Sequence, residues 1–153
     1  PDLRPWCEPI EERRRPPNSA SAANSIAYGI AKALANGQVG LADFTDVGLK
    51  QEAALLVADQ VTCDIDGAYE GKGTVEVQMA DGRTVVETVT QPLGHPSRPL
   101  SDQQLVAKFR DCAAYAAIPI PDSQVSTLID EVMSLETTMD AARIGDLARG
   151  PLV

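Results

Sequence analysis

The chain has 153 residues, of which 44% are hydrophobic and 23% are charged, and its net charge is −9. This composition is typical of a globular domain, and no apolar run approaches the ~20 residues of a membrane span. The excess of acidic over basic residues argues against nucleic-acid and anionic-membrane partners, because both need a dominant basic surface. The first residues contain neither an initiator methionine nor an apolar signal segment, so we expect a processed chain or a part of something longer.

The three cysteines lie far apart in the sequence, at Cys7, Cys63 and Cys112. They form no CxxC pair, and His95 is the one histidine that could join them, so we expect no metal site. Unpaired thiols fit a reducing compartment, and we therefore expect a cytoplasmic protein. Cys112 lies on an apolar helix face, where a small buried side chain is expected.

Proline interrupts the N-terminal segment at Pro1, Pro5, Pro9, Pro16 and Pro17. With little hydrophobic periodicity besides, this predicts an extended arm over residues 1–23. Residues 24–153 are then interpreted as a single domain.

A short amphipathic helix is predicted from about Asn24 to Asn36, with Gly37 as its left-handed cap. At about 100° per residue, its larger apolar side chains fall in one stripe of about 140° that should dock on a core. The stripe consists of Ile26, Ala27, Ile30, Ala31 and Leu34.

Tyr28 falls about 60° beyond that stripe, on the side of Ser25 and Lys32. A phenol at such an edge can pack its ring and still offer its hydroxyl group to a ligand. The alternative is a boundary tyrosine whose hydroxyl bonds to nearby backbone.

The middle of the chain predicts a small antiparallel sheet. After a helix over about 50–61, residues 61–66 alternate like a strand, and residues 74–80 and 83–90 flank Asp81-Gly82, a strong hairpin pattern. A two-residue turn there would pair Val77 with Val86. The prediction is an α+β fold with at least three strands, one Asp-Gly hairpin, and helices packed on one side.

Three further helices are predicted after the sheet. The first begins with Ser101 as its cap and Gln104 closing a capping box. The others are expected over about 122–135 and 139–147, with Pro119 and Pro121 separating the first two.

The sequence contains no GxSxG, P-loop or GxGxxG pattern. His95 lies between Gly94 and Pro96, which predicts an exposed turn rather than a catalytic base. Arginines could hold carboxylates bidentately, at Arg13, Arg14, Arg15 and Arg98. The alternative is that the arginine run is solvated or bridges domains.

Several of these pieces follow one another in a characteristic order. They are the approach segment 9–16, Ser25-x-x-Tyr28-x-x-Ala31, Asp81-Gly82-Arg83, the segment 94–101 (GHPSRPLS) and Lys108-Phe109. Together they resemble the C-terminal part of the MmgE/PrpD family, which includes 2-methylcitrate dehydratase, cis-aconitate decarboxylase and iminodisuccinate epimerase. The resemblance fades after about Ala117.

The resemblance implies a lid domain that closes on a larger helical domain, with the active site in the cleft between them. It implies Tyr28 as a catalytic residue on the lid side, with Ser25 beside it as a substrate-binding residue. Arg15 and Arg98 are the candidates for binding substrate carboxylates. It also implies no metal or organic cofactor. The partners would be the helical domain of the same enzyme and a small polycarboxylate.

We therefore expect the lid domain of an enzyme that dehydrates, decarboxylates or epimerises a small di- or tricarboxylate. The chain alone should be inactive, because most of the acid-base residues would belong to the helical domain. The alternative is a non-catalytic binding or oligomerisation module. An exposed apolar patch would favour homo-oligomers under either interpretation.

Overall fold

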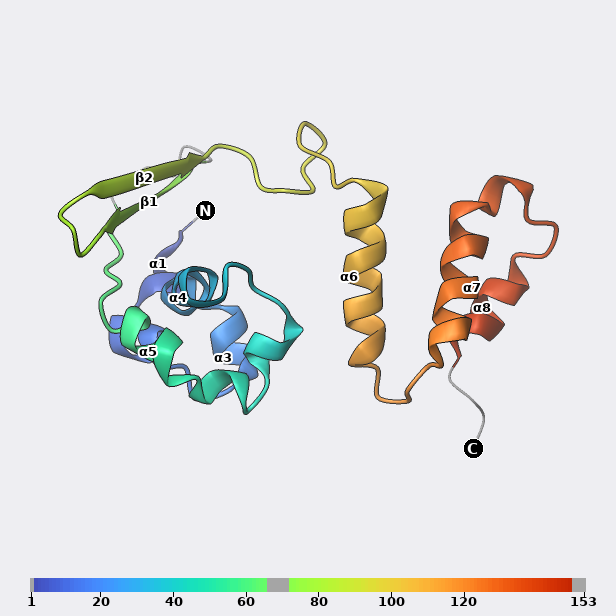
Figure 1. The fold of residues 1–153 in the computed structure, drawn as a ribbon, viewed down its shortest axis with the longest axis horizontal. Helices are drawn as coiled ribbons and strands as arrows, with labels where there is room; N and C mark the ends of the chain where they lie inside the picture. The colour runs from blue at the N-terminus through green and yellow to red at the C-terminus, as the bar shows by residue number, and fades with distance from the viewer. Residues whose placement is uncertain (1, 66–71, 150–153) are drawn as a thin grey trace. The chain divides into compact units, whose positions relative to one another are not determined.

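The computed structural model describes residues 2–65 and 72–149 (Figure 1). The chain divides into two compact units, Pro1–Pro99 and Leu100–Val153, and each is described here by itself. The last residue of the expected strand over 61–66 lies outside the described residues. No helix in the described part of the chain is long and apolar enough to cross a bilayer.

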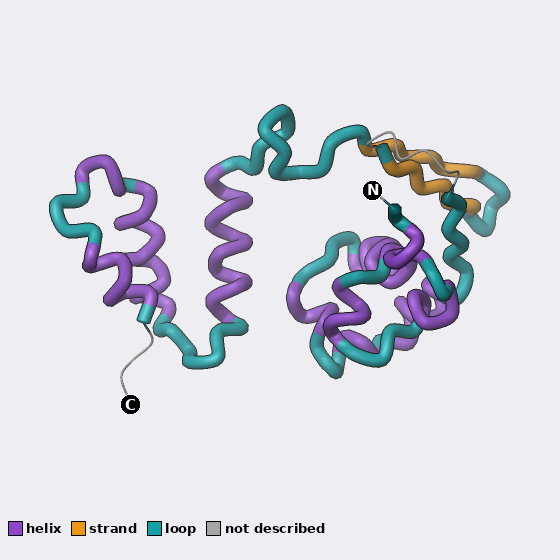
Figure 2. Tube along the Cα trace, turned by 180° about the vertical axis from the view of Figure 1, so that it is seen from behind, coloured by secondary structure: helices purple, strands orange, loops and turns teal. Residues whose placement is uncertain are grey.

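The first unit is built mainly from short helices around a core of alanines, and Figure 2 shows these helices in purple. Its helices are α1 (Arg4–Cys7), α2 (Ile10–Arg14), α3 (Ser19–Ala23), α4 (Ile26–Asn36) and α5 (Glu52–Ala58), with the 3-10 turns η1 (Leu41–Phe44) and η2 (Gly48–Lys50). Helix α4 packs on α5, and the alanines at this contact are fully buried: Ala27, Ala31, Ala54 and Ala58. Small side chains let two helices approach closely.

The N-terminal segment corrects the expectation of an extended arm. Residues 1–23 contain the three short helices α1, α2 and α3. Pro5 lies in the first turn of α1, and Pro9 precedes α2, so neither ring interrupts a helical hydrogen bond. Asn18 caps α3 by accepting a hydrogen bond from the Ser21 amide at 2.9 Å. Proline therefore marks helix starts here.

Helix α4 begins about two residues later than predicted and ends at the predicted residue, where Gly37 closes it with φ of 75°. Its orientation differs from the prediction. The buried residues are Ala27, Tyr28, Ala31 and Lys32, while Ile26 and Leu34 are exposed and Ile30 is half-buried. The helix is thus turned so that only the alanines of the predicted stripe meet the core, and Tyr28 and Lys32 are buried with them.

The sheet consists of β1 (Gly73–Gln78) and β2 (Thr84–Val89), which pair antiparallel. The expected third strand is absent, because described residues 61–65 form no strand. Val77 pairs with Val85 rather than with Val86. The amide of Met79 donates to the carbonyl of Arg83 at 2.8 Å, and three residues, Ala80-Asp81-Gly82, form the loop.

The hairpin loop is therefore one residue longer than the predicted two-residue Asp-Gly turn. Gly82 has φ of 86°, the left-handed position typical of a three-residue hairpin loop. A one-residue shift moves side chains to the opposite face, so Val86 leaves the face of Val75 and Val77. Every residue of β2 is exposed, so the expected covering layer of helices is not seen over this strand.

The second unit contains α6 (Asp102–Ala114), α7 (Asp122–Met133), η3 (Leu135–Thr137) and α8 (Ala142–Ala148). The predicted capping box of α6 is confirmed, because Ser101 and Gln104 each bond to the other's backbone amide. Val125 and Leu128 of α7 are buried. Cys112 is exposed, contrary to expectation, because α6 buries none of its residues.

Candidate functional site

Ser25 and Tyr28 contact each other at the start of α4, where the side chain of Ser25 bonds to the backbone amide of Tyr28 and not to its hydroxyl group. The Ser25 hydroxyl accepts a hydrogen bond from the Tyr28 amide at 3.1 Å and donates to the carbonyl of Arg13 at 2.5 Å. Ser25 is therefore the N-cap of α4 and is itself buried. Its hydroxyl group is engaged on both sides, and its substrate-binding role stays a prediction.

The Tyr28 side chain is fully buried, with a relative exposure of 0%. Its hydroxyl donates to the backbone carbonyl of Asp43 at 2.5 Å, and its ring lies 6.2 Å from that of Phe44 with an interplanar angle of 55°. The expectation of a hydroxyl group facing an open cleft is thus not met within this chain, and the contact matches the alternative of a tyrosine bonded to nearby backbone. Its catalytic role stays a prediction.

Burial reinforces the neutral state that a tyrosine already has at neutral pH. It raises the pKa of the hydroxyl to about 12, and the nearby carboxylate of Asp43 acts in the same direction. At neutral pH Tyr28 is therefore a neutral phenol that can donate a hydrogen bond or a proton, and it cannot act as a base.

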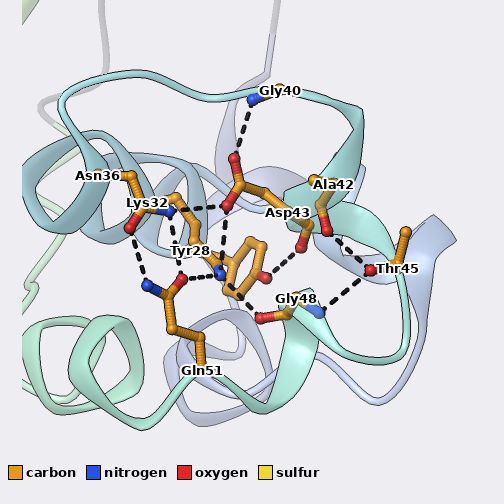
Figure 3. Close-up of polar contacts among 9 residues, drawn as sticks. All are labelled: Tyr28, Lys32, Asn36, Gly40, Ala42, Asp43, Thr45, Gly48 and Gln51. Atoms are coloured by element: carbon orange, nitrogen blue, oxygen red, sulfur yellow. Dashed lines mark hydrogen bonds and ion pairs between the residues drawn. The ribbon is translucent and has the colours of Figure 1, made fainter. Parts of the chain in front are cut away.

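Beside Tyr28 lies a buried polar cluster built around Lys32 (Figure 3). The ammonium group of Lys32 donates to the carbonyl of Gly48 at 2.7 Å and to the side-chain oxygen of Gln51 at 2.5 Å. It also lies 3.4 Å from a carboxylate oxygen of Asp43 and 5.5 Å from the centre of the Tyr28 ring. Two hydrogen bonds and one ion pair therefore engage the ammonium group.

Both carboxylate oxygens of Asp43 also accept hydrogen bonds. One carboxylate oxygen accepts from the side chain of Asn36 at 2.8 Å, and the other accepts from the amide of Gly40 at 2.9 Å. Gln51 in turn donates to the side-chain oxygen of Asn36 at 2.8 Å. Among the described residues, no buried side-chain nitrogen or oxygen lacks a partner. The cluster therefore fastens the segment 40–51 to α4.

Sequence reasoning missed this cluster as a unit. It placed Lys32 on the same side of α4 as Tyr28 without assigning it a partner. One feature could have indicated it: Lys32 is the one charged residue among the eleven of α4. A lone lysine in such an apolar helix has to pair or lie at the surface.

The arginine run is occupied by contacts within the first unit. Arg15 forms a bidentate pair with Asp59 at 2.9 and 2.6 Å. Arg14 binds the carbonyl of Val61 through two nitrogens at 2.9 and 2.7 Å, and Arg13 bonds to the carbonyls of Glu8 and Asn24. Arg15 therefore meets its expected kind of partner, a carboxylate, but the carboxylate belongs to the chain itself.

Arg98 and His95 lie in a tight turn after β2. Arg98 donates to the carbonyl of Gln91 at 3.1 Å, and Nδ1 of His95 bonds to the hydroxyl and amide of Ser97 at 2.8 and 3.2 Å. His95 is exposed, as the sequence predicts. An open depression of about 400 Å³ lies beside Arg98 and is also lined by Glu87. The Glu87 carboxylate weakens the attraction of this depression for a polyanion.

Each of the four candidate residues has its own partners within the chain. Ser25 contacts the backbone of Tyr28, whereas no hydrogen bond or ion pair joins Arg15 or Arg98 to either of them. Within the described ranges, no group of three or more histidine, cysteine, aspartate or glutamate side chains is placed to hold a metal ion. Among the candidates, Tyr28 is a fully buried, neutral phenol beside Lys32.

Cys63 is a thiol of low reactivity near the end of the helical part of the first unit. Burial raises its pKa to about 11, and an interaction with the thiol of Cys7 adds to the shift. Cys7 is buried in α1. The Cys63 thiol is therefore not a ready nucleophile at neutral pH.

Residues 5–135 match the model of the MmgE/PrpD C-terminal domain. The chain belongs to the MmgE/PrpD family and contains its C-terminal domain.

Curated relatives agree with this assignment. A cis-aconitate decarboxylase of Aspergillus terreus is 30% identical over 146 residues, which are 90% of this chain and 29% of that protein. The cis-aconitate decarboxylase-like protein oryM of Aspergillus oryzae is 28% identical over 143 residues, with the same coverage. The chain thus spans less than a third of the length of these relatives.

Proposed function

We propose that this chain acts as the C-terminal lid domain of a lyase or isomerase whose substrate is a small di- or tricarboxylate. The match of residues 5–135 to the C-terminal domain of the family carries the proposal. The relatives named cis-aconitate decarboxylase favour decarboxylation over dehydration and epimerisation. We take a cis-aconitate-like tricarboxylate as the first substrate to test.

Each of these reactions develops negative charge next to a carboxylate. An enzyme for them needs a base, cations that hold the carboxylates, and donors for the developing charge. In this chain Tyr28 is a neutral phenol, Lys32 is engaged by two hydrogen bonds and the ion pair with Asp43, and Arg15 is paired with Asp59. We therefore expect the base and most substrate contacts to come from a helical domain of the same enzyme.

Turnover of cis-aconitate tests the proposal. Both the 153-residue chain and an intact enzyme that contains it would be assayed for release of CO₂ from cis-aconitate and for dehydration of 2-methylcitrate. We expect turnover by the intact enzyme alone. Robust turnover by the chain by itself would contradict the shared site, and failure of the intact enzyme on both substrates would contradict the substrate class.

A catalytic role of Tyr28 has a separate test in the intact enzyme. Because η1 covers the hydroxyl group in this structure, catalysis by Tyr28 requires η1 to move away from α4. We expect Tyr28→Phe to lower kcat by about tenfold or more while the enzyme stays folded, as for the loss of one donor in the transition state. An unchanged kcat at a temperature where the variant is fully folded would leave Tyr28 with a structural role alone.

Arg98 is the candidate whose guanidinium is least engaged, since one backbone carbonyl is its hydrogen-bond partner. If it binds a substrate carboxylate, Arg98→Gln should raise KM by about tenfold, the effect of one charge-assisted hydrogen bond. Arg83→Gln is the matched control, because Arg83 is also exposed and pairs locally with Asp81. Equal KM values in both variants would remove Arg98 from the site.

The alternative function is a binding or oligomerisation module without catalysis. Large exposed apolar side chains favour it, such as Val47 at 83% and Met139 at 102% relative exposure. Sedimentation of the chain at increasing concentration distinguishes the two functions when it is combined with the turnover assay. Self-association in an intact protein that has no activity on polycarboxylates would support the alternative.

A further inference from the structure

Helix α4 has a second face, opposite the buried polar cluster, that the chain leaves open. Ile26, Ile30 and Leu34 follow one another at four-residue intervals and therefore lie along one side of the helix. Leu34 is 49% exposed and Ile26 is 37% exposed, while Ile30 is half-buried. We call these three side chains the outer face of α4.

No charged side chain interrupts the outer face. The one charged residue of α4, Lys32, is fully buried on the opposite side, and the remaining polar side chain besides Tyr28 is Asn36 at the last position. Helix α6 of the same chain shows the usual pattern, with exposed charges at Asp102, Lys108, Arg110 and Asp111. A helix face that carries only apolar side chains is normally packed against another surface.

In α4 small and polar side chains face the core while large aliphatic side chains face outward, which is the reverse of the usual arrangement. This reversal has a physical explanation if another surface covers the outer face in the intact protein. The core of this chain takes the small alanines and the polar cluster of α4, which leaves the largest aliphatic side chains outside. Exposure of such side chains to water costs roughly 25 cal/mol per Å² of apolar surface. A contact that removes them from water recovers this free energy.

We propose that the outer face of α4 is a docking surface for the remaining part of the enzyme, and that Ile26, Ile30 and Leu34 insert into an apolar surface there. This inference rests on the proposed function, because it takes the chain to be one domain of a larger enzyme. The relatives support this occupant: more than two thirds of each lies outside the matched region. An apolar face without charges selects an equally apolar partner, because a charged partner would lose its hydration without gaining a pair.

Hydroxyl-radical footprinting of the intact enzyme, read by mass spectrometry of the peptides, tests the inference. The control is Leu93, which has the same side chain, a relative exposure of 51% and a place outside α4. We expect oxidation at Leu34 to be several-fold lower than at Leu93 in the intact enzyme. Equal oxidation at the two leucines would overturn the inference.

The same measurement on the 153-residue chain distinguishes other occupants. Protection of Leu34 at low concentration would mean that the chain covers the face by itself. Protection that appears only with increasing concentration would mean that a second copy covers it. Either result overturns the proposed occupant.

A variant pair adds a functional readout. In the intact enzyme, Leu34→Glu should lower the melting temperature and the turnover, whereas Leu93→Glu should change neither. The footprint does not depend on substrate, so the two proposals can fail separately. An active cis-aconitate decarboxylase with a reactive Leu34 would contradict the docking surface alone, and a protected Leu34 in an enzyme without this activity would contradict the proposed function alone.

Discussion

The ammonium group of Lys32 lies 3.4 Å from the carboxylate of Asp43, and both side chains are buried. A buried ion pair stabilises a fold only when its other hydrogen-bonding positions are filled, because taking both charges out of water is costly. Here Gly48 and Gln51 complete the partners of Lys32, while Asn36 and Gly40 complete those of Asp43. The pair therefore connects α4 to η1 and η2, the segment that also covers Tyr28.

Lys32→Met should destabilise the chain by about 3–5 kcal/mol, because it leaves a buried carboxylate and a buried carbonyl without their cation. Lys50→Met is the control, because Lys50 is exposed, and it should change the free energy of unfolding by less than about 0.5 kcal/mol. Urea denaturation measures both. The double variant Lys32→Met, Asp43→Asn should lose less than the sum of the single losses; additive losses would show that the two residues are not coupled.

The pKa of Tyr28, about 12, predicts a specific behaviour at high pH. The folded state holds the phenolic proton more tightly than the unfolded state, whose tyrosine titrates near 10. Stability should therefore fall as the pH rises from about 10 to 12, since the unfolded state releases its proton first. In an absorbance titration, Tyr28→Phe should remove the step near pH 12, and Tyr115→Phe should leave it. A tyrosinate signal from Tyr28 near pH 10 in the folded protein would contradict its burial.

The contact between α4 and α5 leaves no room for a larger side chain. Ala31 is fully buried, as are Ala54 and Ala58 of α5. Ala31→Leu should destabilise the chain by about 1–3 kcal/mol or more, because three added carbon atoms force the helices apart. Ala35→Leu places the same side chain at an exposed position of the same helix and should be nearly neutral. Thermal unfolding of the two variants checks this, and equal melting temperatures would argue against the close helix contact.

Gly48 lies where no side chain fits. A Cβ atom there would be 2.2 Å from the carbonyl oxygen of Ala42 and 2.6 Å from that of Asp43. Gly48→Ala should therefore cost about 3 kcal/mol or more, because the backbone of η1 would have to shift. Gly145→Ala in α8 meets no atom within 4 Å and should stabilise its helix by about 0.5–1 kcal/mol. Opposite signs in chemical denaturation are the expected result, and a neutral Gly48→Ala would be inconsistent with the close approach.

Local patterns predicted the helices and their ends with good success. The cap at Ser101 with Gln104 and the glycine cap at Gly37 depend on neighbouring residues alone, and both are confirmed. The hairpin loop was predicted one residue too short, because Asp-Gly fits a two-residue turn and a three-residue loop equally well. The N-terminal helices were missed because proline was taken as a helix breaker at positions where it starts a helix.

The candidate site depends on contacts between distant residues, which local sequence patterns do not predict. Tyr28 was located on the correct side of α4, beside Lys32, but its burial depends on a segment twelve to twenty-three residues further along the chain. The partner of Arg15, Asp59, lies forty-four residues away. A helical wheel orders side chains around one helix and contains no information about which side the rest of the chain will cover.

The order and spacing of short motifs along this sequence were sufficient to predict the family, and the match of residues 5–135 to its C-terminal domain confirms the prediction. Tertiary structure alone decided that α4 turns Ala27, Tyr28, Ala31 and Lys32 inward and leaves Ile26 and Leu34 exposed. The physical reason is that close helix packing needs small side chains, and a buried lysine is tolerated only where distant carbonyl and carboxylate oxygens converge on it.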